Sequence, residues 1–348
     1  PVDIAVTLDV AYADVVNETV TISAGTTSST VTVDVMGELV VEADETFEVN
    51  VSDAKLNGAT DATRVVIGDA QGIGTIGNDD AATLTLAGVA ASQNEGTGGT
   101  TTPFTFSVTL DNPVQGGLDA AYTTSDGTAT VADGDYVDND GSLSFAGTAG
   151  ESKTITVQVN HDATVESDEL FTVALGAISG LGAGIDAGDV STSGTPATGT
   201  VLNDDTAVVT IDDVSMAEGN AGTTAFVFTV SLSNPGDSTI TVDYATADGT
   251  ATIADGDYTA ASGQLTFPPG DQSEPVTVQV TGDTTSEQDE TFTVQLSAPV
   301  GAVIGDGQGE GTIEDDDPPA PPSGFTHTAV TSTSISWAWT DNSYNCLL

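Results

Sequence analysis

Apolar residues recur at every second position along much of this chain. In PFTFSVTL (103–110) and AFVFTVSL (225–232), Phe, Val and Leu occupy alternate places, with mostly Thr and Ser between them. A period of two predicts β-strands that bury one face. Shorter runs such as TITVQV (154–159) and PVTVQV (275–280) follow the same pattern, and Asn-Pro, Asp-Gly and Pro-Gly pairs between the runs favour turns. The sequence therefore predicts an all-β chain of short strands.

The runs belong to a repeat. AAYTTSDGTATVADGDY (120–136) matches VDYATADGTATIADGDY (242–258), and DELFTVAL (168–175) matches DETFTVQL (289–296). About seven short strands in roughly a hundred residues are typical of an immunoglobulin-like Greek-key β-sandwich. The copies differ near their ends, where the first has a longer glycine-rich stretch (177–199), and we expect this insertion in a surface loop before the last strand.

The composition changes the picture through its charge. The 348 residues contain 53 Asp and Glu but only 3 Lys and Arg, for a net charge of −50, which disfavours nucleic acid and anionic membranes as partners. With 38% hydrophobic residues, 39 Gly and 13 Pro, the chain is nevertheless typical of folded β domains rather than of a disordered acidic tail. The single Cys346 excludes an intramolecular disulfide, and no apolar run is long enough to cross a membrane.

The acidic residues recur at fixed places. VEADETF (41–47), VESDELF (165–171) and SEQDETF (286–292) are each followed, 23 to 32 residues later, by NDD or DDD. Carboxylates that return at matched strand ends indicate oxygens that converge on a common site, and Ca²⁺ takes six to eight such oxygens. Because so few basic side chains are present, the charge must be neutralised by metal, salt or water. We therefore expect Ca²⁺ as the cofactor.

These motifs also carry a family resemblance. The early EG pair, the DGTA…DGDY block, the E-x-D-E-x-F strand start and the closing N/D-D-D together resemble the Calx-beta module of sodium–calcium exchangers and of large bacterial surface proteins. The resemblance covers about residues 1–317 and implies tandem immunoglobulin-like sandwiches in an elongated array. It predicts a partial module that lacks its first strands, two complete modules, a Pro-rich linker, and the start of a fibronectin type III-like module with Trp337 and Trp339 (1–80, 81–205, 206–317, 318–323 and 324–348).

The resemblance further implies that calcium lies at one tip of each sandwich, held by loop carboxylates. His161 and Asn203 stand where acidic residues are usual, so we expect the strongest binding in the third module. The expected ligands are, in the third module, Glu218, Asp257, Asp283, Glu287, Glu290, Asp315, Asp316 and Asp317; in the second, Glu95, Asp135, Asp162, Glu166, Glu169, Asp204 and Asp205; and in the first, Glu38, Glu42, Glu45, Asp79 and Asp80.

Other interpretations of the acidic residues remain open. They could form only a hydrated surface, as in halophilic proteins, although surface charge has no reason to recur at matched strand ends. Asp126 and Asp248 in the DGTA motifs are expected to cap turns rather than bind metal. The chain is not expected to be an enzyme, because His161 and His327 lie in different modules and no nucleophile is paired with a base.

The junctions point to a role. NDDAATLTL and NDDTAVVTI pass from one module into the next almost without a spacer, so calcium at the tip would stiffen the array. We expect a calcium-rigidified stretch of a long extracellular or cell-surface protein, either an adhesin stalk or a structural fibre. The alternatives are a regulatory calcium sensor and a module that binds glycans or surface partners, the latter disfavoured by few aromatic residues.

A further possibility is self-assembly. THTAV and SISWAW near the C-terminus could complete the open first module of another copy and so build a head-to-tail filament. The simpler interpretation, which we favour, is that this sequence is part of a longer chain.

Overall fold

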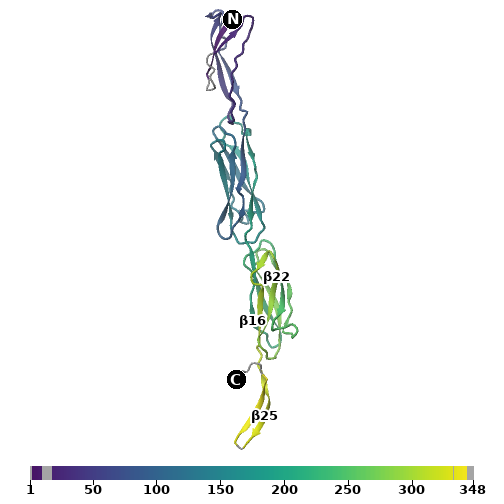
Figure 1. Cartoon of the computed structure of the whole chain (residues 1–348). Coiled ribbons are helices and arrows are strands. Elements are labelled where there is room, and N and C mark those ends of the chain that lie inside the picture. Colours follow the sequence, from purple (N-terminus) through teal and green to yellow (C-terminus); the bar gives the residue numbers. More distant parts are fainter. Residues whose placement is uncertain (1, 10–17, 332, 343–348) are drawn as a thin grey trace. The chain divides into compact units, whose positions relative to one another are not determined.

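The computed structural model describes residues 2–9, 18–331 and 333–342 (Figure 1). The fold is all-β. Contacts between Cα atoms divide the chain into two compact units. The first comprises Pro1–Gln93, Thr101–Asn160 and Glu169–Val201, and the second comprises Asn94–Thr100, His161–Asp168 and Leu202–Leu348. The loops 94–100 and 161–168 therefore belong to the second unit, although both of their ends continue into the first.

The first predicted module forms a single antiparallel sheet in the order β2-β1-β3-β4, with β5 also paired to β3. Among the described residues of this segment no second sheet faces it. Val35, Met36 and Leu39 lie in an irregular stretch after β2 and are 50%, 75% and 64% exposed. The strands are Val2–Asp9 (β1), Glu18–Ile22 (β2), Glu45–Leu56 (β3), Ala59–Thr60 (β4) and Gln71–Ile76 (β5).

The second module is a sandwich of two sheets, β10-β9-β12-β14-β7 and β11-β8-β6-β13. The glycine-rich stretch is only partly a loop, because Val190 is buried and its segment adds β13 as a parallel edge strand on β6. The elements are Ala82–Ala90 (β6), Ser92–Asn94 (β7), Thr101–Leu110 (β8), Leu118–Asp126 (β9), Gly141–Phe145 (β10), Ser152–Asn160 (β11), Glu169–Ser179 (β12), the 3₁₀ turn Ala187–Asp189 (η1), Val190–Ser193 (β13) and Ala197–Leu202 (β14).

The third module repeats this sandwich with the sheets β19-β21-β17-β15-β23 and β16-β24-β22-β18-β20. Its β23 pairs in parallel with β15, as β13 pairs with β6. The strands are Ala207–Ile211 (β15), Val214–Ala217 (β16), Gly222–Leu232 (β17), Ile240–Asp248 (β18), Tyr258–Thr259 (β19), Ser262–Phe267 (β20), Ser273–Gly282 (β21), Glu290–Val300 (β22), Ala302–Ile304 (β23) and Gln308–Glu314 (β24).

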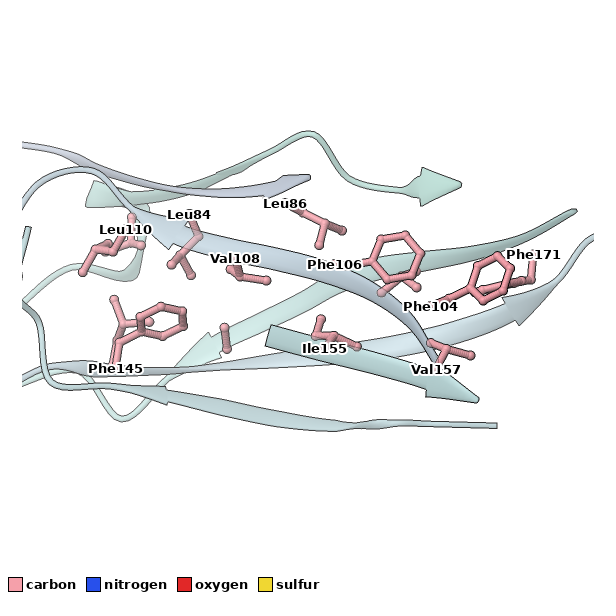
Figure 2. Close-up of a cluster of buried hydrophobic side chains, with 14 of the residues drawn as sticks. Leu84, Leu86, Phe104, Phe106, Val108, Leu110, Phe145, Ile155, Val157 and Phe171 are labelled. Atoms are coloured by element: carbon pink, nitrogen blue, oxygen red, sulfur yellow. The ribbon is translucent and has the colours of Figure 1, made fainter. Parts of the chain in front are cut away.

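The alternating positions form the cores, as the sequence predicted. Phe104, Phe106, Val108 and Leu110 on β8 are fully buried, and Figure 2 shows them beside the other apolar side chains of this sandwich. Phe171 on β12 is the centre of the aromatic packing. Its ring lies 5.7 Å from Phe104, 6.1 Å from Phe106 and 4.9 Å, stacked, from Tyr136.

Phe292 has the same place in the third module, 4.7 Å from the stacked ring of Tyr258. A glycine on the neighbouring strand makes room for it, since a Cβ on Gly311 would lie 2.5 Å from the Phe292 ring. Gly199 has the same relation to Phe171, at 2.3 Å.

The DGTA aspartates cap turns, as predicted. Asp248 Oδ1 accepts hydrogen bonds from the Ile253 amide (3.1 Å) and from the Tyr258 hydroxyl (2.7 Å), and Asp126 does the same for Val131 and Tyr136. Burial and then the hydrogen bond to Asp248 raise the pKa of Tyr258 to about 12. The aspartate thus fixes the tyrosine that stacks on the central phenylalanine.

The C-terminal segment is a hairpin of β25 (Ala320–Val330) and β26 (Ile335–Asn342). It contains the predicted strands THTAV and SISWAW. Its first strand begins at Ala320, within the predicted Pro-rich linker (318–323), and the predicted module bounds stay a prediction. The fibronectin type III resemblance stays a prediction. No helix among the described residues has the length and hydrophobicity needed to cross a membrane.

Replacing Phe292 by Ala should destabilise the third module by about 3–5 kcal/mol, because it removes a fully buried aromatic side chain and leaves a cavity. Differential scanning calorimetry of the whole chain would detect the change as a lowered transition. Val227→Ala on β17, a strand of the opposite sheet, is the control, since Val227 is 49% exposed and should change stability by less than about 0.5 kcal/mol. Equal effects of the two substitutions would contradict this assignment of the core.

Candidate metal centre

Carboxylates from separate segments of the third module line one pocket. Glu218 lies in the turn between β16 and β17, Asp257 precedes β19, and Glu287 and Glu290 lie before and at the start of β22. Asp315 follows β24. The pocket is lined by Glu218, Asp257, Glu287, Gln288, Glu290, Ile313 and Asp315.

A tighter group lies beside this pocket. Glu218, Asp283 and Asp317 each place a carboxylate oxygen within 4.8 Å of the others. Glu218 and Asp317 are buried, at 8% and 7% exposure. Both Asp317 oxygens are buried without a hydrogen-bond donor among the described residues. A buried carboxylate without a donor is costly unless it is protonated or bound to a cation.

The pKa values of these groups report the same crowding. Burial raises the pKa of Glu218 to about 7, and the charges of Asp283, Glu287, Asp317 and Asp315 add to the effect in that order. Burial likewise raises the pKa of Asp317. Loss of hydration and like charges both disfavour the ionised carboxylate, so without a cation the site holds protons that an exposed Glu would lose.

A second crowded pair lies at the start of β22. Burial, and then the charge of Asp257 and a hydrogen bond with it, raise the pKa of Glu290 to about 7, with smaller contributions from Glu287 and Asp255. Two carboxyl groups share a hydrogen bond only if one is protonated. A divalent cation removes the need for that proton. Asp255 was not among the ligands expected from the sequence, although it is the first aspartate of the DGDY motif at 255–258.

Other predicted ligands of this module hold the backbone. Asp316 accepts hydrogen bonds from the Gly219 amide and the Asn220 side chain, both at 3.2 Å, and is not part of the group of three. Asp315 accepts from the Asp317 amide at 3.1 Å. Its own amide donates to Asp289 at 3.2 Å. Asp289 is the third residue of the E-x-D-E motif, and sequence reasoning gave it no role.

The second module repeats the buried group. Glu95, Asp204 and Asp205 lie together in the second compact unit, with oxygens within 4.8 Å of one another. Burial, and then the charges of Asp162 and Glu166, raise the pKa of Glu95 to about 8. The buried Asp205 Oδ2 has no hydrogen-bond donor among the described residues.

Its remaining predicted ligands are divided between the units. In the first unit, Asp135 and Glu169 place oxygens within 4.8 Å of each other. In the second, the Asp162 carboxylate accepts from the Thr164 amide at 2.6 Å. His161 Nδ1 lies 2.8 Å from the Thr100 hydroxyl, and its ring occupies the space next to Gly96.

Asn203 uses both its donor and its acceptor atoms in hydrogen bonds. Its Oδ1 accepts from the amides of Glu166 (3.4 Å) and Asp205 (3.3 Å), and its Nδ2 donates to the Asp205 carbonyl (3.2 Å). An aspartate could not donate this last bond. The asparagine therefore holds the acidic loop against the NDD segment.

The first module gathers fewer of its predicted ligands. Burial, then the charge and hydrogen bond of Glu38, and then the charge of Asp80 raise the pKa of Glu42. Asp79 is exposed, and Glu45 is half-buried at the start of β3. The groups of three ligand atoms found among the described residues include none from this module.

The residues of the second and third modules suit a hard cation. All members of both buried groups are carboxylates, and buried oxygens of Asp205 and Asp317 have no hydrogen-bond donor in the described part of the chain. Ca²⁺ takes such oxygens and tolerates irregular geometry. Bound there, it would supply positive charge and coordination to oxygens that the fold leaves unneutralised.

The raised pKa values predict how metal-free stability depends on pH. Between pH 4.5 and about 7, folded Glu218 and Glu290 hold protons that the unfolded chain has lost, so the free energy of unfolding should fall as pH rises through this window. Thermal melts in chelator at increasing pH should show the third module's Tm falling by about 4–8 °C for each kcal/mol of unfolding free energy that is lost.

Glu218→Gln should flatten that dependence, because it removes one of the titrating groups. Glu310→Gln, at an exposed position on β24, should leave it unchanged. A Tm that rises with pH in chelator would contradict the prediction.

A known family matches most of the chain. The Calx-beta domain model matches residues 8–71, 78–199 and 202–317, which make up most of the chain. No curated protein sequence matches this chain.

Similar solved structures are the calcium-binding domains of Calx. CBD12 of CALX1.2 is 23% identical over 62% of this chain and 80% of its own, with a TM-score of 0.28. The apo form of the Calx CBD1 domain is 26% identical over 32% of this chain and 100% of its own, with a TM-score of 0.30. The Calx CBD2 domain is 17% identical over 31% of this chain and 86% of its own, with a TM-score of 0.29. The assignment rests on the family match and on the acidic groups at the expected motifs: the chain belongs to the Calx-beta domain family of calcium-binding β-sandwich modules.

Proposed function

We propose that this chain binds Ca²⁺ at the carboxylate groups of its second and third modules, and that the ions stiffen the modules and their junctions. One observation carries the proposal. Buried oxygens of Asp205 and Asp317, the last aspartates of NDD and DDD, have no hydrogen-bond donor among the described residues in either module. A hydrated acidic surface of the halophilic kind has no reason to bury its carboxylates.

Calcium would act here as a structural part. The chain has 3 Lys and Arg against 53 Asp and Glu, and one of these cations, Lys153, pairs with Glu151, so basic side chains are too few to neutralise the acidic groups. Saturation at about 100 times the dissociation constant would add about 2.7 kcal/mol for each independent site. That is a large share of the stability of a small domain.

We further propose that the region serves in an extracellular or cell-surface protein, as part of an adhesin stalk or a structural fibre. A millimolar extracellular calcium supply suits sites that act as structural parts. The large negative charge keeps such an array soluble and weakens attraction between copies. A regulatory sensor is the alternative, and graded calcium affinities together with a neighbouring transport or signalling domain would favour it.

Calcium binding should be measurable by isothermal titration of the whole chain. Replacing Glu287 and Glu290 by Gln together should weaken the third module's binding about 100–10,000-fold, because each substitution removes a charged ligand worth about 1.5–3 kcal/mol. Glu166→Gln with Glu169→Gln is the matched pair for the second module, and each pair should leave the other module's binding intact. Absence of calcium heat, with a Tm unaffected by chelator, would favour the hydrated-surface interpretation.

Stiffening of the array is a separate expectation. Small-angle scattering of the whole chain should give a longer maximum dimension in calcium than in chelator. Equal dimensions, in a sample that titration shows to be calcium-loaded, would refute stiffening while leaving calcium binding intact.

A further inference from the structure

The residue before the acidic motif makes a contact that the calcium site does not explain. In the first unit the Val41 amide donates to the Pro113 carbonyl (3.0 Å), and the Val41 carbonyl accepts from the Gln115 amide (2.9 Å). Val41 forms a parallel bridge with Val114, and the two are 0% and 2% exposed. Val41 thus belongs to the hydrophobic core of the strands that follow it, rather than to its own sheet.

The second unit contains the same contact. The Val165 amide donates to the Pro235 carbonyl (2.9 Å), and the Val165 carbonyl accepts from the Asp237 amide (3.2 Å). Val165 bridges Gly236 and packs against the core formed by residues 207–313. Because the two contacts lie in different units, they are independent occurrences of one arrangement.

The receiving element is the Asn-Pro turn after the second long strand of each sandwich. Its asparagine ties the turn to the start of that sandwich: Asn112 Nδ2 donates to the Ala81 carbonyl (2.8 Å) and Asn234 Nδ2 to the Thr206 carbonyl (3.1 Å). The Asn-Pro turn is therefore fixed by its own module.

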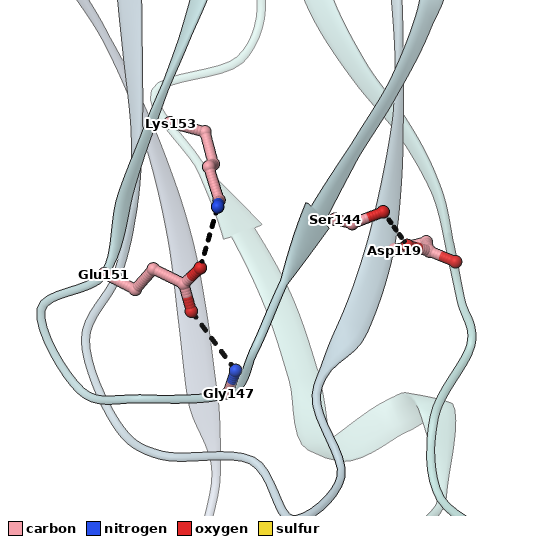
Figure 3. A network of polar contacts seen from close by, with 5 residues as sticks. All are labelled: Asp119, Ser144, Gly147, Glu151 and Lys153. Atoms are coloured by element: carbon pink, nitrogen blue, oxygen red, sulfur yellow. Dashed lines mark hydrogen bonds and ion pairs between the residues drawn. The ribbon is translucent and has the colours of Figure 1, made fainter.

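In the first unit an ion pair lies next to a residue that contacts this turn, and Figure 3 shows the pair of Lys153 with Glu151 and the hydrogen bond from Gly147 to Glu151. Gly147 accepts from the Val114 amide at 3.0 Å and donates its own amide to Glu151 at 3.2 Å, while Glu151 pairs with Lys153 at 3.0 Å. Gly147 has φ +86°, and a Cβ there would lie 2.0 Å from the Val114 carbonyl oxygen. Only glycine fits this close approach.

A second position also differs between the first two modules and the third. Asn78 Oδ1 accepts from the Glu42 amide (3.3 Å), and its Nδ2 donates to the Asp80 carbonyl and to the Asp189 carboxylate, both at 3.1 Å. Asn78 therefore links the acidic loop to the chain that leads into the following sandwich, as Asn203 does in the second module. The third module has Ser286 in place of the valine and Asp315 in place of the asparagine, and the Ser286 hydroxyl donates to Asp315 at 3.4 Å.

We propose that the loop bearing the E-x-D-E motif is a docking element, whose partner is the Asn-Pro turn of a following Calx-beta module. Val at position 41 or 165, together with Asn at position 78 or 203, marks a module whose loop docks on a following Calx-beta module. Ser286 and Asp315 mark a module whose loop does not. Val41 and Val165 directly precede Glu42 and Glu166, so a cation that orders those carboxylates would also order the docking residue; this last step rests on the proposed function.

Hydrogen–deuterium exchange of the whole chain would test the docking element. Val165→Pro removes the amide that donates to Pro235 and so should open the contact, and the Asp237 amide should then exchange about tenfold faster, the effect of losing roughly one net hydrogen bond. Ser286→Pro is the matched control at the equivalent position, and it should leave the 234–239 segment unchanged. Exchange in β8 and β17 should stay slow in both variants, which shows that the sandwiches remain folded.

The outcomes separate docking from calcium binding. Equal exchange of residues 234–239 in the unsubstituted chain and in Val165→Pro, with β17 protected, would overturn the docking proposal. Should proline unfold the sandwich, Val165→Ser, which keeps the amide but removes the apolar contact, should still speed exchange of the segment, and no change would overturn the proposal. Added calcium should slow this segment only in the unsubstituted chain. A proline effect without a calcium effect would leave docking intact and count against the proposed function at this loop.

Discussion

Repulsion among carboxylates is the constraint on which the rest of this structure depends. In the third module several strand ends and turns meet at one pocket, and most of the residues that line it are Asp or Glu. With burial added, ionised Glu95, Glu218 and Glu290 are disfavoured to the point that their pKa values reach about 7 to 8. The fold therefore offers oxygen ligands to a cation, and a bound cation would supply the charge that the fold lacks.

The acidic residues divide into two classes that look alike in the sequence. Asp126, Asp248, Asp289 and Asp316 accept hydrogen bonds from backbone amides and fix turns. Asp205 and Asp317 have buried oxygens with no such donor among the described residues. The first class holds the backbone around the site, and the second has buried oxygens that a bound cation would neutralise. Both classes are needed, because a group of repelling carboxylates stays together only if the surrounding backbone is held by other interactions.

Strand positions could be read from the sequence because alternation of apolar residues directly reflects which face is buried. The central strands around Phe171 and Phe292 follow it closely. The small parallel edge strands β13 and β23 could not be predicted, since three or four residues in a glycine-rich stretch carry no usable period. For the site, the repeat identified the carboxylates that meet around Glu218, but it could not separate Asp316, which holds the Gly219 turn, from Asp317. Only the direction of each side chain decides that.

Asn203 stands where acidic residues are usual, and its side chain connects two segments of the chain. An amide both accepts and donates, so one side chain joins the acidic loop, through Glu166, to the chain segment at Asp205. Aspartate can only accept, and Asp315 in the third module takes a hydroxyl from Ser286 instead. Asn in place of Asp at this position removes one negative charge from a crowded site and adds one hydrogen-bond donor to the NDD segment. The two modules thus use the same position for different purposes, charge in one and connection in the other.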